Sequence, residues 1–197
     1  MARPREFKTD DVIEKAMQVF WTHGYEDASL PDLLNGMGLT RGSLYKAFKD
    51  KKNLFLLVLD RYEAKAVDAD VDLLTDPDIK EGTQRILMLY SSVVRAVTDA
   101  DHRGCLLCTA TASEAVNDPD MAKALHQGLA KIQDGFVQAL KDAESHKALD
   151  ASHQLRLANV LLTQYVGLRV LARSNLPLGV LGQSVQGIED ILRVSVR

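Results

Sequence analysis

Apolar residues recur every three or four positions along almost the whole chain, and this spacing is the strongest constraint on its fold. The spacing matches the 3.6-residue repeat of the α-helix, and few alternating β-branched runs are present that would indicate strands. Hydrophobic residues make up 46% of the 197 residues and charged residues 26%, which is the balance of a folded protein with a substantial core. We therefore expect an all-α chain.

No apolar run reaches the roughly 20 residues that a membrane-spanning helix needs. The longest candidate, 157–168, is bounded by Arg156 and Arg169 and interrupted by polar residues. The N-terminal segment lacks the apolar stretch of a signal peptide, and two cysteines three residues apart do not make a disulfide scaffold. The sequence therefore predicts a cytoplasmic protein that has no membrane partner.

Start and stop signals divide the chain into helices. Thr9 is expected to cap the first helix, which ends at Gly24, and Ser29 and Thr40 are expected to cap the second and third. We expect a polar stretch at 70–82 to separate the fourth helix from the fifth. The predicted helices cover 9–23, 30–36, 40–48, 51–66, 80–99, 104–116, 119–144, 151–173 and 179–195.

Residues 25–48 place two helices around a tight, glycine-containing turn, which is the helix-turn-helix pattern. The second helix of such a unit buries one face against its neighbours and presents the other to the major groove of DNA. Leu44 and Phe48, four residues apart, are suited to the buried face. The polar residues around them are left for DNA, so the sequence predicts a nucleic-acid interface here.

The residue types on this exposed face suit distinct contacts with DNA. Thr40 caps a helix whose N-terminus favours a phosphate, and Arg41 can pair with a guanine edge. Tyr45 and Lys51 can donate to phosphates, which positions the protein without reading sequence. An N-terminal basic arm could follow the minor groove. The predicted DNA-binding residues are Arg3, Arg5, Thr40, Arg41, Ser43, Tyr45, Lys46 and Lys51.

The charge distribution agrees with this placement although the net charge is −3. Residues 1–55 hold nine Lys or Arg and eight Asp or Glu, and most of these basic residues cluster at 3–8 and 41–52. The remainder of the chain is acidic. An acidic body with locally basic segments is compatible with binding a polyanion through one face.

Two segments, 20–30 and 38–55, make the first 58 residues resemble the DNA-binding domain of TetR-family transcriptional regulators. The similarity runs without a gap from about residue 8 to 58, and its most specific part is the Ser-Leu-Tyr-x-x-Phe-x-x-Lys pattern at 43–51. The chain departs from the family pattern at 34–36, where Leu-Asn-Gly replaces more helix-favouring residues. We expect this departure to loosen the turn.

The resemblance implies an N-terminal three-helix helix-turn-helix domain, 1–55, and a larger helical ligand-binding and dimerisation domain, 56–197. It implies a ligand-responsive regulator, a repressor by our leading hypothesis, that binds a palindromic double-stranded DNA operator as a homodimer. In the family, a cavity among the middle helices takes a small-molecule effector, whose identity the sequence does not specify.

The last two predicted helices independently favour a dimer. Helix 151–173 carries apolar residues on all sides, so it needs a core on one face and a partner on the other. In helix 179–195, Leu181, Val185, Ile188 and Leu192 form one apolar stripe, with Val180, Ile191 and Val194 outside it. The alternative is a central core helix in a monomer.

His102-Arg-Gly-Cys-Leu-Leu-Cys108 is the other distinctive segment. Cys105 and Cys108 share a helix face near an expected N-terminus, where the helix dipole and nearby basic residues lower a thiol pKa. Some TetR-like regulators use a cysteine in this region as a sensor, so both are candidates for ligand or redox sensing. The alternative is that both are small apolar core residues.

Two rival hypotheses remain, which the sequence favours less, and only the first of them uses these cysteines. The first is an enzyme or thiol redox protein, but we find no set of nucleophile, base and orienting residue and no phosphate-binding loop, so we expect no catalytic residues, cofactor or enzymatic activity. A metal site is not expected either, because His102, Cys105 and Cys108 do not converge from one helix. The second rival is an interaction module that has lost DNA binding.

Overall fold

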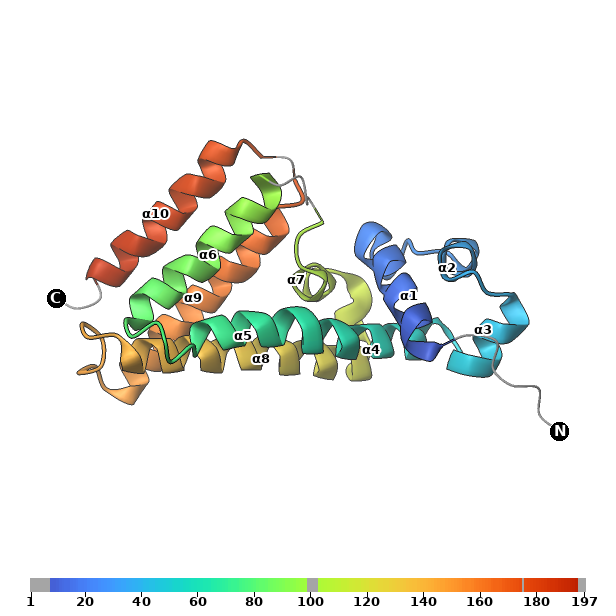
Figure 1. Ribbon diagram of the computed structural model, residues 1–197, viewed down its shortest axis with the longest axis horizontal. Helices are drawn as coiled ribbons and strands as arrows, with labels where there is room; N and C mark the ends of the chain where they lie inside the picture. Colours follow the sequence, from blue (N-terminus) through green and yellow to red (C-terminus); the bar gives the residue numbers. More distant parts are fainter. Residues whose placement is uncertain (1–7, 99–102, 175, 195–197) are drawn as a thin grey trace.

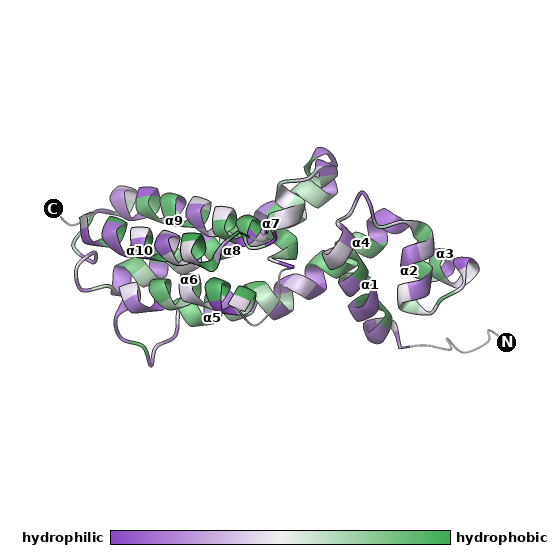
Figure 2. Ribbon diagram, turned by 90° about the horizontal axis from the view of Figure 1, so that it is seen from above, coloured by the Kyte–Doolittle hydropathy of each residue, from purple (hydrophilic) through white to green (hydrophobic). Residues whose placement is uncertain are grey.

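The computed structural model describes residues 8–98, 103–174 and 176–194, and in these ranges it is built of helices and connecting turns (Figure 1). The all-α prediction is confirmed. Helices α1–α3 lie at one end of the long axis and α6, α9 and α10 toward the other, and the view from above shows the same separation (Figure 2). Helices α4, α5 and α8 run between the two ends.

The predicted helices appear in the predicted order, but α5 and a π-helical turn are added, and the predicted helix 104–116 is a short α-helix followed by a separate 3-10 turn. The elements are α1 Thr9–His23, α2 Leu30–Met37, α3 Arg41–Phe48, α4 Lys51–Tyr62, a π-helical turn Glu63–Val67, α5 Asp68–Leu74, α6 Gly82–Thr98, α7 Leu106–Thr111, a 3-10 turn Glu114–Asn117, α8 Pro119–Asp142, α9 Ala151–Leu171 and α10 Leu178–Val194.

Two of the three predicted caps are present. Ser29 and Asp32 form a reciprocal capping box at the start of α2, with the Ser29 amide donating to Asp32 Oδ2 at 3.1 Å and the Asp32 amide to Ser29 Oγ at 3.3 Å. Thr40 caps α3. The prediction for Thr9 was wrong, because Thr9 already has helical backbone and the cap position falls on Lys8, whose side chain makes no capping hydrogen bond.

The predicted separation at 70–82 was wrong in its first part. The chain stays helical through the π-helical turn and α5, and only 75–81 leave the helix before α6 begins. Val67 and Leu74 are fully buried, and α5 packs along α8. Burial of these apolar side chains therefore outweighs the local preference of the neighbouring aspartates for a loop.

Helix α8 is the centre of the body and packs against α5, α6 and α9. Tyr90, Phe136 and Tyr165 come from α6, α8 and α9, and their ring centroids lie 6.1–6.4 Å apart. All three side chains are fully buried. Aromatic rings at such separations add directional contacts to a large buried area, so this cluster holds the three helices together.

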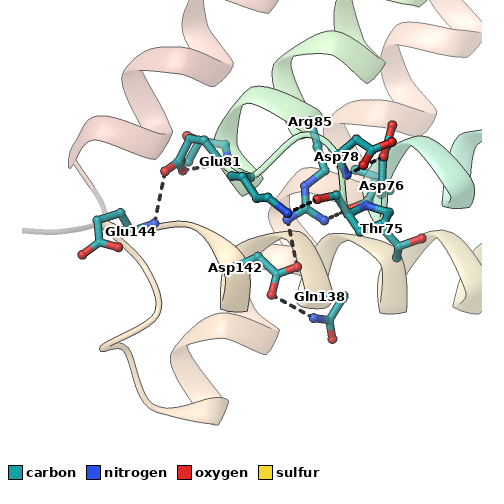
Figure 3. Close-up of polar contacts among 12 residues, drawn as sticks. Thr75, Asp76, Asp78, Glu81, Arg85, Gln138, Asp142 and Glu144 are labelled. Carbon is teal, nitrogen blue, oxygen red and sulfur yellow. Dashed lines mark hydrogen bonds and ion pairs between the residues drawn. The ribbon is translucent and has the colours of Figure 1, made fainter.

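A buried arginine fastens the α5–α6 turn to the end of α8 (Figure 3). Arg85 donates to the Leu74 carbonyl at 2.9 Å and to Asp142 Oδ2 at 2.8 Å. Beside it, Glu81 accepts from Thr83 and from the Glu144 amide, which adds a second link between the turn and the segment after α8. The turn is thus held by side chains from two distant parts of the sequence.

Helices α9 and α10 each have a buried and an exposed apolar face. On α10, Leu181, Ile188 and Leu192 are buried, and this helix packs against α6, so the predicted stripe belongs to the core of the protomer. Five large apolar side chains of these two helices stay 42–47% exposed: Leu155, Val160, Leu171, Leu178 and Val180. None of the described helices combines the length and apolar character needed to cross a bilayer.

Candidate nucleic-acid interface and buried thiol site

Helix α3 has the two faces that a recognition helix needs. Leu44 and Phe48 are buried, whereas Arg41, Tyr45 and Lys46 are exposed. The helix lies at the end of the molecule farthest from α10 (Figure 1), so no part of the body covers its polar face. This arrangement leaves an exposed polar helix face of the kind that enters a major groove.

The N-terminus of α3 is well ordered by its own side chains. Thr40 Oγ1 accepts from the Ser43 amide at 3.3 Å and lies 3.0 Å from the Ser43 hydroxyl. The Arg41 guanidinium lies 5.9 Å from the centroid of the Tyr45 ring, close enough for a cation–π contact. Arg41 and Tyr45 therefore form one exposed pair beside a helix start whose Ser43 amide is already capped by Thr40.

Lys51 occupies a different position from the one expected of a free phosphate donor. Its Nζ donates to the Glu26 carbonyl at 3.0 Å and lies 4.8 Å from the centroid of the Tyr25 ring. Partial burial lowers the pKa of Lys51. Lys51 thus ties the start of α4 to the α1–α2 loop, and its contact with DNA stays a prediction. Arg3 and Arg5 lie outside the described residues.

The departure at 34–36 has a steric reason. Helix α2 continues through these residues to Met37 and ends at Gly38, whose φ of 67° is left-handed. A Cβ placed on Gly36 would lie 2.4 Å from Val19 Cγ2. Glycine at this position therefore allows α1 and α2 to approach closely, and the expected loosening of the turn is absent.

Cys105 and Cys108 lie together at the start of α7. Cys105 is the N-cap residue of this helix, and its Sγ accepts from the Cys108 amide at 3.4 Å. Both thiols are free and fully buried. Full burial is what a core residue shows, but the groups around the pair are not apolar.

Polar side chains from three other helices reach this site. Arg169 Nε donates to the Tyr165 hydroxyl at 2.9 Å, and Arg169 Nη2 donates to Asp70 at 3.1 Å. Tyr165 also donates to Asp70, and Tyr62 is among the groups that lower the pKa of the Cys105 thiol. The cysteine pair therefore lies beside a partly buried, hydrogen-bonded cluster in which the positive charge of Arg169 is paired with Asp70.

The pKa values of the two thiols shift in opposite directions at this site. Burial by itself would raise the pKa of the Cys105 thiol, but hydrogen bonding from Cys108, the positive charge of Arg169 and hydrogen bonding from Tyr62 together lower it to about 6. The hydrogen bond to Cys105 and burial raise the pKa of Cys108. The lowered pKa of Cys105 favours its thiolate form, whereas the raised pKa of Cys108 favours its protonated form.

Sequence reasoning found the cysteines but not the residues that activate Cys105. His102, the expected neighbour, lies outside the described residues. In the sequence, Arg169 was noted only as the charged residue that ends an apolar run. Nothing in the sequence around Tyr62 and Asp70 indicates their contacts, because these contacts join segments far apart in the chain. Within the described ranges, no three His, Cys, Asp or Glu side chains gather where they could hold a metal ion.

A second set of contacts missed by the sequence joins this site to α1. Trp21 Nε1 donates to the Gly104 carbonyl at 3.1 Å, and its ring meets the Tyr62 ring edge-on at 5.2 Å. Arg173, just after α9, donates to the Trp21 carbonyl at 2.9 Å and to the Arg103 carbonyl at 3.0 Å. The end of α1 is thus bonded to the residue that precedes Cys105.

The sequence of the helix-turn-helix segment is similar to that of known proteins. Residues 12–58 match the family model described as bacterial regulatory proteins, tetR family. The uncharacterized HTH-type transcriptional regulator YezE of Bacillus subtilis (strain 168) is 30% identical over 152 residues, which cover 76% of this chain and 77% of YezE. The chain belongs to the TetR family of bacterial regulatory proteins.

Other TetR-family proteins cover nearly the whole chain. The HTH-type transcriptional repressor ComR of Escherichia coli (strain K12) is 28% identical over 99% of this chain and 90% of its own length. A cysteine mutant of the regulator CifR, solved with 26-bp double-strand operator DNA, has a TM-score of 0.78 at 28% identity and covers 93% of this chain and 98% of its own. These similarities identify a DNA-binding transcriptional regulator.

The reduced form of E. coli NemR has the same fold, with a TM-score of 0.78 over 92% of this chain and 94% of its own, at 22% identity. The family thus accounts for the helix-turn-helix unit and for the helical body behind it. It does not by itself assign a role to any single residue of this TetR-family chain.

Proposed function

We propose that this TetR-family chain is a homodimeric repressor that binds a palindromic operator and is released from it by a small-molecule or thiol-reactive inducer. The observation that carries the DNA-binding part is the exposed face of α3, where Arg41, Tyr45 and Lys46 surround a capped helix start. Repression is supported by ComR, which is named a transcriptional repressor. Operator binding is supported by CifR, whose structure contains operator DNA.

In this proposal the two domains predicted from the sequence have different roles. Residues 1–55 bind DNA, and residues 56–197 bind the effector and the second protomer. Helix α4 crosses this boundary without a break, because it begins at Lys51 in the helix-turn-helix unit and leads into α5 beside α8. A movement of the body is therefore transmitted directly to the DNA-binding end.

Among the predicted DNA contacts, we assign positioning and reading to different residues. Thr40, Ser43, Lys46, Tyr45 and Lys51 position the protein on phosphates, with help from Arg3 and Arg5, and Arg41 reads a base edge. Tyr45→Phe removes the hydroxyl without changing burial, and should weaken binding to all sequences equally. Arg41→Ala should instead relax base preference, measured by competition between operator variants.

Lys51→Ala gives a further test of the assignment. It should weaken binding to all sequences and reduce the slope of log affinity against log salt by about one, if Lys51 turns to a phosphate on binding. Because Lys51 also bonds to the α1–α2 loop, its thermal midpoint is measured alongside. An unchanged salt slope with altered base preference would contradict the assignment of Lys51 to a phosphate.

The inducing step is assigned to Cys105 because its thiol is the activated one. Methyl methanethiosulfonate is a small probe for this step. The Cys105 thiolate attacks the sulfenyl sulfur, a new S–S bond to the methylthio group forms, and the S–S bond of the reagent breaks to release methanesulfinate. The added group enlarges a fully buried side chain and removes its charge, so we expect the surrounding helices to shift.

A gel-shift assay with the DNA that flanks the gene of this protein tests the whole proposal. Untreated protein should bind, treated protein should release the DNA, and dithiothreitol should restore binding. Cys105→Ser should bind DNA and ignore the reagent, whereas Cys108→Ser should still respond. Absence of binding by the untreated protein would contradict the regulator proposal. If DNA binding survives full modification of Cys105, both cysteines are core-packing residues and the inducer is a non-covalent effector.

A further inference from the structure

The end of α1 is joined to residues 103–105, called the sensor segment below, by a hydrogen bond that neither the family nor the proposed function assigns. Trp21 Nε1 donates to the carbonyl of Gly104, and Gly104 directly precedes Cys105, the N-cap of α7. The same indole ring packs edge-on against Tyr62, a side chain that helps to lower the pKa of the Cys105 thiol. Trp21 therefore contacts the surroundings of Cys105 by two routes, one through the backbone and one through Tyr62.

Gly104 cannot move independently of α9. Its φ is +68°, and a Cβ at this position would lie 2.6 Å from the Arg169 carbonyl oxygen and 2.9 Å from Arg173 Cγ. The peptide that links Gly104 to Cys105 is thus held between α9 on one side and Trp21 on the other. A change in the volume of the Cys105 side chain must be accommodated by one of these two contacts.

Two arginines strengthen the connection between Trp21 and the body. Arg173 donates to the carbonyls of Trp21 and Arg103, so one guanidinium joins the C-terminal end of α1 to the sensor segment. This end of a helix carries partial negative charge, which favours a cation. The Arg103 guanidinium lies 4.1 Å from the centroid of the Trp21 ring and donates to Gln18 of α1.

From these contacts we infer that Trp21 is the positioning residue that transmits the state of Cys105 to the helix-turn-helix unit. The inference rests on the proposed function, since it presumes that Cys105 reacts. Helix α1 packs against α2, which fixes the turn before α3. A displacement of Trp21 rotates α1 and with it the recognition helix. In a dimer, such a rotation changes the spacing of the two recognition helices, which an operator tolerates poorly.

Trp21 is the only tryptophan of the chain, so its fluorescence reports on this contact alone. Modification of Cys105 with methyl methanethiosulfonate should shift the emission maximum of the wild-type protein, and dithiothreitol should reverse the shift. Cys105→Ser should show no shift. An emission spectrum that does not change on full modification of Cys105 would overturn the inference, because the indole would then not sense the thiol.

The decisive measurement compares operator affinity before and after modification. For the wild type we expect modification to weaken binding about tenfold or more, within the usual range of coupling between two sites. Trp21→Phe keeps an aromatic ring against Tyr62 but removes the indole N–H donor. It should be modified at Cys105 to the same extent, by mass spectrometry, while the loss of affinity falls to about threefold or less.

Lys15→Ala serves as the matched control, because Lys15 is an exposed residue of α1 that is turned to solvent. It should keep the full response. Arg173→Gln, which removes the guanidinium bonds to the Trp21, Thr22 and Arg103 carbonyls but leaves Trp21 in place, provides a second test should Trp21→Phe not fold. A full wild-type response in either folded variant would overturn the inference. A wild type that is fully modified yet binds DNA unchanged would refute thiol induction itself, which is a distinguishable result.

Discussion

The exposed apolar face of α9 and α10 predicts how the proposed dimer can be separated without unfolding the protomer. Val160 lies on this face with 43% of its surface exposed. Burying a whole valine stabilises by about 2 kcal/mol, so burying this exposed part contributes about 1 kcal/mol. Because a twofold axis uses the same residue twice, Val160 contributes about 2 kcal/mol to the dimer.

Val160→Glu removes this contribution and adds two carboxylates that must leave water. The dissociation constant of the dimer should therefore rise by at least roughly thirtyfold, since about 1.4 kcal/mol corresponds to a factor of ten. Sedimentation equilibrium across a range of protein concentrations measures this shift directly. Affinity for a palindromic operator should fall as well, because a monomer occupies one half-site.

Two controls separate dissociation from unfolding. Leu57 is 42% exposed but lies on α4, so Leu57→Glu should change neither the oligomeric state nor the circular dichroism. Ile188 is buried in the protomer, so Ile188→Glu should unfold the chain instead of yielding a folded monomer. A wild type that is monomeric at micromolar concentration, or a folded Val160→Glu variant that dimerises as tightly as the wild type, would refute the reasoning.

Three further predictions concern the body. The rate at which Cys105 reacts with methyl methanethiosulfonate should rise with pH through about 6 and then level off, whereas an ordinary thiol gains rate up to about 8.5; mass spectrometry across pH tests this. Burial lowers the pKa of His146, so the folded state prefers the neutral ring and the free energy of unfolding should fall as the pH drops through about 6.5. In urea titrations, His146→Gln should flatten this pH dependence between about pH 5 and 7. Arg85→Ala should lower the free energy of unfolding by about 3 kcal/mol in thermal unfolding, because it leaves the Leu74 carbonyl without its partner, whereas Asp142→Asn should lower it less, since Asp142 is 38% exposed. Equal losses in the two variants would contradict this account.

The DNA-binding end was predictable because its information is local. A capping serine or threonine, a helix-ending glycine and apolar residues four apart act within one or two turns of helix, so Gly24, Ser29 and Thr40 could be placed from the sequence alone. The same holds for Leu44 and Phe48, whose burial follows from helical spacing. The contacts of individual residues with DNA bases stay predictions, because they depend on a partner that the spacing does not describe.

The body was less predictable where packing competes with local preference. The aspartates at 68–72 favour a loop, yet burial of Val67 and Leu74 against the body keeps this segment helical. On α10, periodicity identifies Leu181 and Ile188 as one stripe, but it does not say whether the stripe meets α6 or a second protomer. Only the packing of α10 on α6 decided that it belongs to the core.

The sequence by itself determined that this chain is helical, where its recognition helix begins, and that two cysteines lie three residues apart near a helix start. Only the tertiary structure decided that Cys105 lies beside Arg169 and Tyr62, and that Trp21 bonds to Gly104 across 83 residues of sequence. The reason is physical. Helix spacing and caps depend on neighbours within a few residues, whereas the pKa of a buried thiol and the link between two domains depend on side chains that only folding brings together.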